Sequence, residues 1–445
     1  MYREALLGEI GELTLSYISS MEEDKELVEE VIQSLIAHVR ELREGKLVDE
    51  ETAGEIESEL KKLLHDPAPL FEIGAEDIHE AIEIFLKERL GKTEGYLPLG
   101  KSRNDHVSAA LRLKTKKLLK EQMREIIKLR FLLLEKAEKY SRVPMPGFTH
   151  LQPAQPSTFA HYLLAIEEGL ADYTKALLTA LNIADRSPLG AGAVGGTSAP
   201  LDRHRLGSEL FSGIVTNTIY ATSSRDFMAL ACSVDTSLSV FLSRIAEDIV
   251  VFSTPNFDYL SLPEEHLATS SMMPQKRNPA TMEVARAWAG EAIGHLTAIL
   301  SVLKGLPTGY NLDIQEANKH AFRILKGTLA TLTVFRDLIS KIEPKAHNML
   351  RDSHLFPILA TDVAEKMAIS SGRPYREVYT EVAKMIRESR DVGEFYKKVE
   401  ERYGIKIDLS EGLKKPVTGS PNPDKIKEAI EMARKRLVED SKAVC

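Results

Sequence analysis

The chain has 445 residues, of which 43% are hydrophobic and 28% charged, enough apolar material for a large core or for two to three domains. Its 58 basic and 66 acidic residues give a formal charge of -8, which opposes tight binding to nucleic acid or to an anionic membrane and favours a small-molecule partner. Cys232 and Cys445 are the only cysteines and form no CxxC motif, so we expect neither a disulfide framework nor a zinc cluster, as suits a reducing cytosol.

The N-terminal segment MYREALLGEIGELTL carries Glu4, Glu9 and Glu12 where a signal peptide requires an apolar segment. Elsewhere no apolar run approaches the roughly 18 residues of a membrane-spanning helix. We therefore expect a cytoplasmic protein with no membrane partner.

Shorter amphipathic helices are predicted in residues 1–102, for example Lys25 to Arg43 and Ala75 to Leu90, separated by polar breaks. This region is predicted to form an N-terminal helical domain.

Very long helices are predicted in residues 103–351. From Arg103 to Val143 there is no Gly or Pro, and apolar residues recur at helical spacing. Helices this much longer than the average of about 11 to 12 residues are typical of an extended bundle, so we predict a central five-helix bundle that also serves oligomerisation. The four further helices are predicted at about 157–185, 214–254, 280–303 and 314–342.

Residues 352–445 are predicted to form a small C-terminal helical domain, which includes a Pro- and Gly-rich loop from Lys414 to Pro423. Alternating strand patterns are almost absent from the chain, and no internal repeat is found. The predicted fold class is therefore all-α, with three helical domains.

Two glycine-rich segments match nucleotide-binding patterns. Gly95 to Ser102 (GYLPLGKS) fits the phosphate-loop pattern, which makes a triphosphatase an alternative function. That loop requires a preceding strand, whereas the preceding pattern is helical, and Pro98 has no N–H to offer a phosphate. Gly190 to Gly195 (GAGAVG) has no βαβ unit around it, so we interpret it as a connection at the end of the bundle.

The most informative segment is Thr269 to Pro279 (TSSMMPQKRNP). Asn278 followed by Pro279 is typical of a helix N-cap and first helical position, where free N–H groups and the helix dipole favour an anion. Lys276 adds positive charge, and Ser270 lies in a rather apolar stretch that can close over a substrate.

This segment resembles the GSSxMPxKxNP signature of the fumarase/aspartase superfamily, and its MPQK form is that of the argininosuccinate lyases. The resemblance covers about residues 12 to 385. Four other segments agree with it in order and spacing: EDIHE (76–80), GKSRND (100–105), PGFTHLQPAQP (146–156) and GLPTGYNLDIQE (305–316).

The resemblance implies an acid–base elimination without metal or organic cofactor. Removing a proton from carbon beside a carboxylate creates an enolate-like dianion, so the site needs a base, cations and an acid for the departing nitrogen. By resemblance Ser270 is the base and Lys276 stabilises the dianion, while His150 is the acid and pairs with Glu283.

The resemblance also implies a set of substrate-binding residues. Those for the fumarate half are Ser102, Arg103, Asn104, Thr149, Gln275 and Asn278. Those for the arginine half are Ser20, Asp24, Asp77, His79, Tyr310 and Gln315.

The chain departs from the family pattern at several positions. Many members have Lys three residues after Gln315, whereas this chain has Asn318 there and Lys319 one residue further on, which puts the contact at that place in doubt. The other departures are Leu99, Lys101, His106, Thr269 and Pro153, and none removes a proposed catalytic group.

The expected function is that of an argininosuccinate lyase, which splits argininosuccinate reversibly into arginine and fumarate. The resemblance implies a homotetramer whose sites are shared between subunits, and the length of the first bundle helix requires the same if Arg103 and His150 serve one site. The alternatives are an adenylosuccinate lyase or aspartase-like member of the superfamily, a non-catalytic structural homologue and the phosphate-loop triphosphatase.

Overall fold

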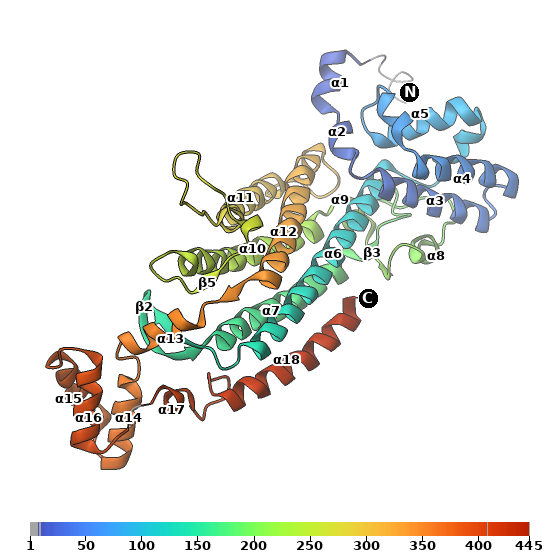
Figure 1. Ribbon diagram of the computed structural model, residues 1–445. Coiled ribbons are helices and arrows are strands. Elements are labelled where there is room, and N and C mark those ends of the chain that lie inside the picture. The colour runs from blue at the N-terminus through green and yellow to red at the C-terminus, as the bar shows by residue number, and fades with distance from the viewer. Residues whose placement is uncertain (1–7, 9, 407, 445) are drawn as a thin grey trace. The chain divides into compact units, whose positions relative to one another are not determined.

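The computed structural model describes residue 8, residues 10–406 and residues 408–444 (Figure 1). Glu4, Glu9 and Cys445, which entered the sequence arguments, lie outside the described residues. The chain divides into two compact units. The first unit comprises residues 1–122, 176–237 and 290–329, and the second comprises residues 123–175, 238–289 and 330–445. The three-domain division stays a prediction.

Helices dominate both units, which confirms the predicted all-α class. Five long helices each contribute residues to both units: α6 (Arg103–Lys139), α7 (Phe159–Ala184), α10 (Asp226–Ser253), α11 (Ala280–Leu303) and α12 (Glu316–Lys341). The shorter helices of the first unit are α1 (Glu12–Ile18), α2 (Met21–Asp24), α3 (Val28–Glu44), α4 (Glu50–His65), α5 (Ile78–Leu90), α8 (Arg203–Ser208) and α9 (Thr218–Ser223). Those of the second unit are α13 (Ala346–Leu355), α14 (Ala360–Ser371), α15 (Tyr375–Arg387), α16 (Val392–Tyr403), α17 (Leu409–Leu413) and α18 (Pro423–Val444).

The strands are short and pair two by two. They are β1 (Pro144–Thr149) with β2 (Gln152–Thr158), β3 (Arg186–Ser187) with β4 (Gly213–Ile214), and β5 (Leu260–Ser261) with β6 (Glu343–Pro344). Four 3-10 turns complete the described elements: Ala68–Glu72, Thr93–Tyr96, Glu264–His266 and Leu312–Gln315.

Two of the predicted long helices have different ends in the structure. The helix predicted for 103–143 ends at Lys139, before the chain enters β1. The helix predicted from 214 begins only at Asp226, because β4 and α9 occupy the preceding residues. Ser224 has an extended backbone that ends α9, and its hydroxyl oxygen accepts a hydrogen bond from the backbone N–H of Asp226, which starts α10.

Buried polar contacts join the long helices within each unit. In the first unit, the Gln122 side chain on α6 donates to Asp235 on α10 at 2.6 Å and to the carbonyl of Leu325 on α12 at 2.8 Å. Burial raises the pKa of Asp235 well above its usual range. One glutamine thus fixes the mutual register of three helices, because each of its bonds would be lost if a helix slid.

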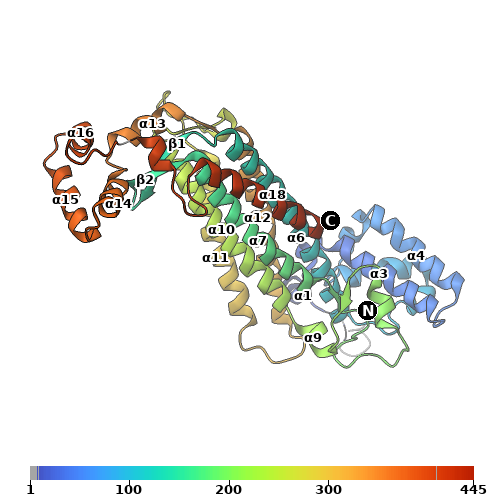
Figure 2. The same ribbon diagram turned by 90° about the horizontal axis from the view of Figure 1, so that it is seen from below.

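In the second unit, Arg130 on α6 is fully buried and contacts two carboxylates. Its Nε lies 2.9 Å from Glu167 on α7, and its Nη1 lies 2.6 Å from Asp440 on α18. Arg436 of α18 also reaches Glu167, at 2.7 Å. Figure 2 shows α18 lying along α7, as these contacts require.

We expect Arg130→Met to lower the free energy of unfolding by about 3 kcal/mol, because the substitution leaves buried carboxylates without their shared cation. Arg434→Met is the matched control, since Arg434 pairs with Glu135 and Glu138 at the surface, where such pairs contribute at most about 1 kcal/mol. Denaturant unfolding of both variants checks this. Equal losses in the two variants would contradict it.

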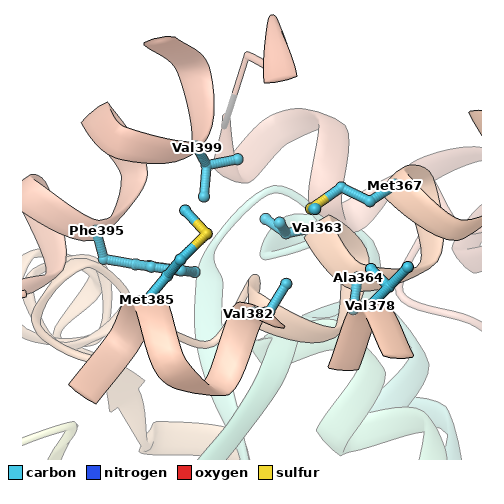
Figure 3. Close-up of a cluster of buried hydrophobic side chains, with 8 residues drawn as sticks. All are labelled: Val363, Ala364, Met367, Val378, Val382, Met385, Phe395 and Val399. Atoms are coloured by element: carbon cyan, nitrogen blue, oxygen red, sulfur yellow. The ribbon is translucent and has the colours of Figure 1, made fainter. Parts of the chain in front are cut away.

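A separate hydrophobic cluster holds α14, α15 and α16 together within the second unit. Figure 3 shows its side chains directed toward one another from these three helices. The buried members are Val363, Ala364, Met367, Val378, Val382, Met385, Phe395 and Val399. Apolar residues at helical spacing on each short helix therefore find their partners locally.

Among the described helices, α10 alone is long and apolar enough to cross a membrane by length and composition. Of its most apolar window, 56% is buried inside the protein, as in the core helix of a bundle.

Candidate active site

His150 lies at the tip of a β-hairpin. Strands β1 and β2 pair in an antiparallel register that joins Thr149 to Gln152, so His150 and Leu151 form a two-residue turn. Their φ angles are 53° and 57°, a left-handed conformation that non-glycine residues rarely adopt. Such backbone strain is concentrated at functional sites, and here it holds the imidazole of His150 exposed at the tip beside the exposed Thr149.

The signature segment forms a loop that is closed at its base. The backbone N–H of Ala268 donates to the carbonyl of Asn278 at 2.8 Å, and the N–H of Asn278 donates to the carbonyl of Ala268 at 2.9 Å. Between these residues the chain projects as a loop immediately before α11 (Figure 1). We call residues 268–278 the signature loop.

The predicted N-cap role of Asn278 is wrong. The first α-helical hydrogen bond of α11 runs from the N–H of Glu283 to the carbonyl of Pro279, so the helix begins one residue later than predicted. Asn278 instead belongs to the bridge that closes the loop, because its backbone groups are engaged with Ala268.

Ser270 is the half-buried residue of an otherwise exposed stretch. Its Oγ accepts hydrogen bonds from the backbone N–H groups of Met272 at 3.2 Å and Met273 at 3.1 Å. Two donors aimed at one oxygen favour its ionised form, which is the form that a base requires.

The other predicted groups of the second unit are exposed at the surface. Gln275 and Lys276 lie on the signature loop, and Glu283 lies on the first turn of α11. Within the described residues, no hydrogen bond or ion pair joins His150 to Glu283.

A cavity of about 210 Å³ in the first unit collects most of the other predicted residues. The predicted residues among its lining are Ser20, Asp24, Asp77, Arg103, Asn104, Tyr310 and Gln315. Five further residues also line it, namely Glu76, Val107, Arg225, Leu312 and Asn318. Three carboxylates and two guanidinium groups in one cavity suit a ligand that carries both charges, as an amino acid does.

Local hydrogen bonds set the positions of the acidic residues in this cavity. Asp77 caps α5 by accepting from the N–H of Glu80, while the Glu80 carboxylate accepts from the N–H of Glu76, one residue before the cap. The outward oxygen of Asp77 lies 2.9 Å from Nη1 of Arg103 at the start of α6. The predicted clamp residue Arg103 is therefore already oriented by an acidic neighbour.

Asp24 is a half-buried carboxylate of the cavity. Its Oδ2 accepts from the hydroxyl of Ser20 at 2.8 Å and from the N–H of Ile78 at 3.3 Å. Burial, assisted by the neighbouring Asp77 carboxylate, raises the pKa of Asp24 to about 6.

Arg225, which sequence reasoning missed, is almost fully buried in the cavity wall. Its Nη1 donates to the carbonyls of Thr222 and Ser224, no carboxylate pairs with it, and its Nε has no hydrogen-bond partner among the described residues. Burial lowers the pKa of Arg225 to about 10, which still leaves it charged at neutral pH. A buried cation without a counter-ion indicates a site for an anionic ligand group. The only signal in the sequence was an arginine directly before a long apolar helix.

Two predicted residues of the first unit, His79 and Ser102, do not line the cavity. His79 is buried behind it, where burial lowers the pKa of the imidazole to about 4 and Nδ1 has no partner among the described residues. The side chain of Ser102 is engaged in a local hydrogen bond, because its hydroxyl oxygen accepts from the backbone N–H of Asn104.

The structure excludes a phosphate loop at Gly95 to Ser102. Helix α5 precedes the segment where that motif needs a strand, and the 3-10 turn Thr93–Tyr96 overlaps its first residues. Lys101 is buried in an ion pair of 2.7 Å with Glu83, so its ammonium group is committed. The second glycine-rich segment folds against α6, where the N–H of Gly192 donates to Asp105 at 3.0 Å.

One group among the described residues has the geometry of a metal site, namely Glu265, His266 and Asp337. However, the ammonium group of Lys341 contacts both Glu265 and Asp337, and thus already supplies the positive charge. We therefore assign no metal to this group.

The chain is similar to known proteins over most of its length. Residues 11–294 match the family model described as Lyase. The chain is 60% identical to an argininosuccinate lyase of Pyrococcus furiosus over 442 residues, which cover 99% of this chain and 96% of that protein. It is 41% identical to an argininosuccinate lyase of Sulfolobus acidocaldarius, covering 97% and 92% of the two chains.

Solved structures show the same fold. The crystal structure of EDDS lyase in complex with formate has a TM-score of 0.83 at 25% identity, covering 94% of this chain and 88% of that one. The class II fumarase of Schistosoma mansoni has a TM-score of 0.70 at 15% identity, covering 85% and 91%. With near-complete coverage by close relatives and a matching family model, the chain belongs to the argininosuccinate lyase family.

Proposed function

We propose that the chain carries out the reaction of its family, the reversible elimination of fumarate from argininosuccinate to give arginine, through the signature loop, the hairpin tip and the charged cavity. The observation that carries the proposal is the pair of backbone N–H groups on Ser270 Oγ in the same loop as Lys276. Arginine biosynthesis in the cytoplasm is the setting that this reaction implies.

In the proposed mechanism, ionised Ser270 removes a proton from the carbon beside a succinyl carboxylate. The resulting negative charge spreads onto that carboxylate, where Lys276 stabilises it. His150 then gives a proton to the departing guanidinium nitrogen as the carbon–nitrogen bond breaks, and fumarate and arginine result. Glu283 is proposed to orient the ring of His150. These steps use protons and charges only, and need no metal or organic cofactor.

The cavity of the first unit is proposed to bind the remaining substrate groups. Arg103 and Asn104 at the start of α6 offer donors to a carboxylate, and Arg225 offers a buried guanidinium to another. Asp24 and Asp77 can accept from amino or guanidinium groups, together with Tyr310 and Gln315. Ser20 also lines this cavity. The proposed set is completed by residues outside it, namely Ser102, His79, Thr149, Gln275 and Asn278.

The proposed site is shared between subunits of a homotetramer. Helix α6 has 37 residues, and at about 1.5 Å per residue it separates Arg103 from Lys139 by about 55 Å. The 11 residue steps from Lys139 to His150 span at most about 37 Å, so they cannot bring His150 back to Arg103 within one chain. If both residues serve one site, they come from different subunits.

The experiment that tests the reaction is a parallel assay of fumarate release. Purified protein is given argininosuccinate, adenylosuccinate or aspartate, with ATP hydrolysis measured as a control. We expect release from argininosuccinate only. Release from adenylosuccinate or aspartate instead would favour another superfamily reaction, and no release from argininosuccinate would sink the proposal.

We expect the affinity for arginine in the reverse reaction to fall below about pH 6. Because burial raises the pKa of Asp24 to about 6, its carboxylate is present above that pH and is lost as the pH falls, by roughly tenfold per pH unit. The KM for arginine should rise accordingly.

Asp24→Asn should raise the KM for arginine at neutral pH and remove its rise in acid. Glu22→Gln is the control, because Glu22 is exposed and pairs with Lys25. A KM for arginine that keeps its full acid dependence in Asp24→Asn would withdraw Asp24 from the site.

A further inference from the structure

We propose that His266 is a positioning residue, which joins the two stems of the signature loop to each other and ties both to α12, and so fixes where Ser270 and Lys276 stand. This inference rests on the function proposed for the loop. It assigns a role to a residue that no motif in the sequence singled out.

The geometry places His266 directly beneath the loop. The residue ends the 3-10 turn Glu264–His266, two positions before the bridge that closes the loop, and its side chain is buried. Its Nδ1 lies 2.9 Å from Oγ1 of Thr281, in the first turn of α11, and its Nε2 lies 2.9 Å from Oδ2 of Asp337 on α12. One imidazole thus connects the entering stem, the leaving stem and a long helix.

The chemistry of the partners fixes the orientation of the ring. The carboxylate of Asp337 only accepts, so Nε2 of His266 carries the hydrogen and donates it. Nδ1 then accepts from the hydroxyl of Thr281. Rotation of the ring would leave two polar groups in a buried place without partners, at a cost of about 1 to 3 kcal/mol each.

The position of the signature loop depends on the contacts of its two stems, because the side chains of the loop itself are largely exposed. The hydrogen bonds of Ser270 stay within the loop, since both donors come from Met272 and Met273. These bonds determine the conformation of the turn, whereas the contacts of the stems determine its position in the protein. Displacing a reacting group by about 1 Å can lower the rate by up to about a hundredfold. A small movement of the loop stems is therefore enough to affect catalysis.

His266→Ala tests the inference with two readouts. We expect kcat for argininosuccinate to fall by about tenfold or more while KM changes by less than about threefold, because the loop supplies the base rather than most of the binding. We also expect trypsin to cleave after Lys276 and Arg277 about tenfold faster, with the cut located by mass spectrometry, because a loosened loop opens more often.

Two further variants separate positioning from general stability. His266→Gln restores a donor to Asp337 and an acceptor toward Thr281, and we expect it to recover most of the kcat and the protection from trypsin. Lys345→Met is the matched control, since it also replaces a lysine that pairs with an exposed carboxylate, but that carboxylate is Asp258 and is no partner of His266. It should keep wild-type values in both readouts.

Unchanged kcat and unchanged cleavage in His266→Ala would overturn the inference. If that variant does not fold, Thr281→Val takes its place, because it removes only the hydroxyl on the leaving stem, and wild-type values there would overturn the inference equally. Fumarate release by the wild-type protein tests the proposed function independently of the His266 variants. Absence of fumarate release in the wild type would contradict the function, while the trypsin comparison would still decide the role of His266.

Discussion

Ser270→Ala is expected to lower kcat by about 10² to 10⁴ fold while the affinity for argininosuccinate stays within about tenfold. The hydroxyl is used only in the proton transfer, so its loss removes transition-state stabilisation and little of the binding. Steady-state fumarate release measures kcat, and calorimetry of the inactive variant measures the affinity. The two hydrogen bonds that Ser270 Oγ accepts from Met272 and Met273 give the physical reason why a serine can act here.

Ser271→Ala is the matched control for this experiment. Ser271 is the next residue of the same loop and is exposed. Its substitution by alanine also removes one hydroxyl group from the loop, but leaves the two N–H donors of Ser270 unchanged. We expect near wild-type turnover. If Ser270→Ala keeps more than a few per cent of the wild-type rate, or if both variants lose activity equally, Ser270 is not the base.

The long helices could be predicted because apolar residues recur at helical spacing throughout their length. In α6 the apolar spacing repeats over many turns without Gly or Pro, and its start at Arg103 is as predicted. The start of α10 could not be predicted, because the apolar pattern continues backward through α9 and only the extended backbone of Ser224 separates the two. A local hydrogen bond, rather than hydropathy, decides that boundary.

The hairpin that carries His150 was missed for a related reason. Proline at 144, 146, 153 and 156 interrupts the strand pattern, and proline in a sequence usually argues against a strand. A two-stranded ribbon tolerates these residues, because each strand has a free edge where no ladder hydrogen bond is lost.

The candidate site divides in the same way. Residues in strong motifs, such as Ser270 and Arg103, could be chosen from the sequence, although their roles stay predictions. Arg225 and His266 could not be chosen, because no motif surrounds either of them. Arg225 is identified by the cavity that it lines, and His266 by its contact with a residue far along the chain. Burial and pairing of this kind arise only when segments far apart in the chain meet.

The second large effect is expected when two inactive variants are mixed. Arg103→Ala lacks a clamp for the substrate, and His150→Asn lacks the acid, so each should be nearly inactive alone. Co-expressed or co-refolded at equal amounts, they should regain about a quarter of the wild-type activity. In random assembly, a site takes native His150 from one subunit with a probability of about one half and native Arg103 from another with the same probability.

A second mixture distinguishes shared sites from mere stabilisation by mixing. Asp24 and Arg103 line the same cavity of one chain, so no assembly of Arg103→Ala with Asp24→Asn can rebuild a native cavity. This mixture should show only the mean activity of its two parents. If mass spectrometry shows mixed oligomers and the first mixture also shows only the mean activity of its own parents, the site is not shared. Since a helix of 37 residues keeps Arg103 and His150 apart within one chain, one of the two would then have to leave the site.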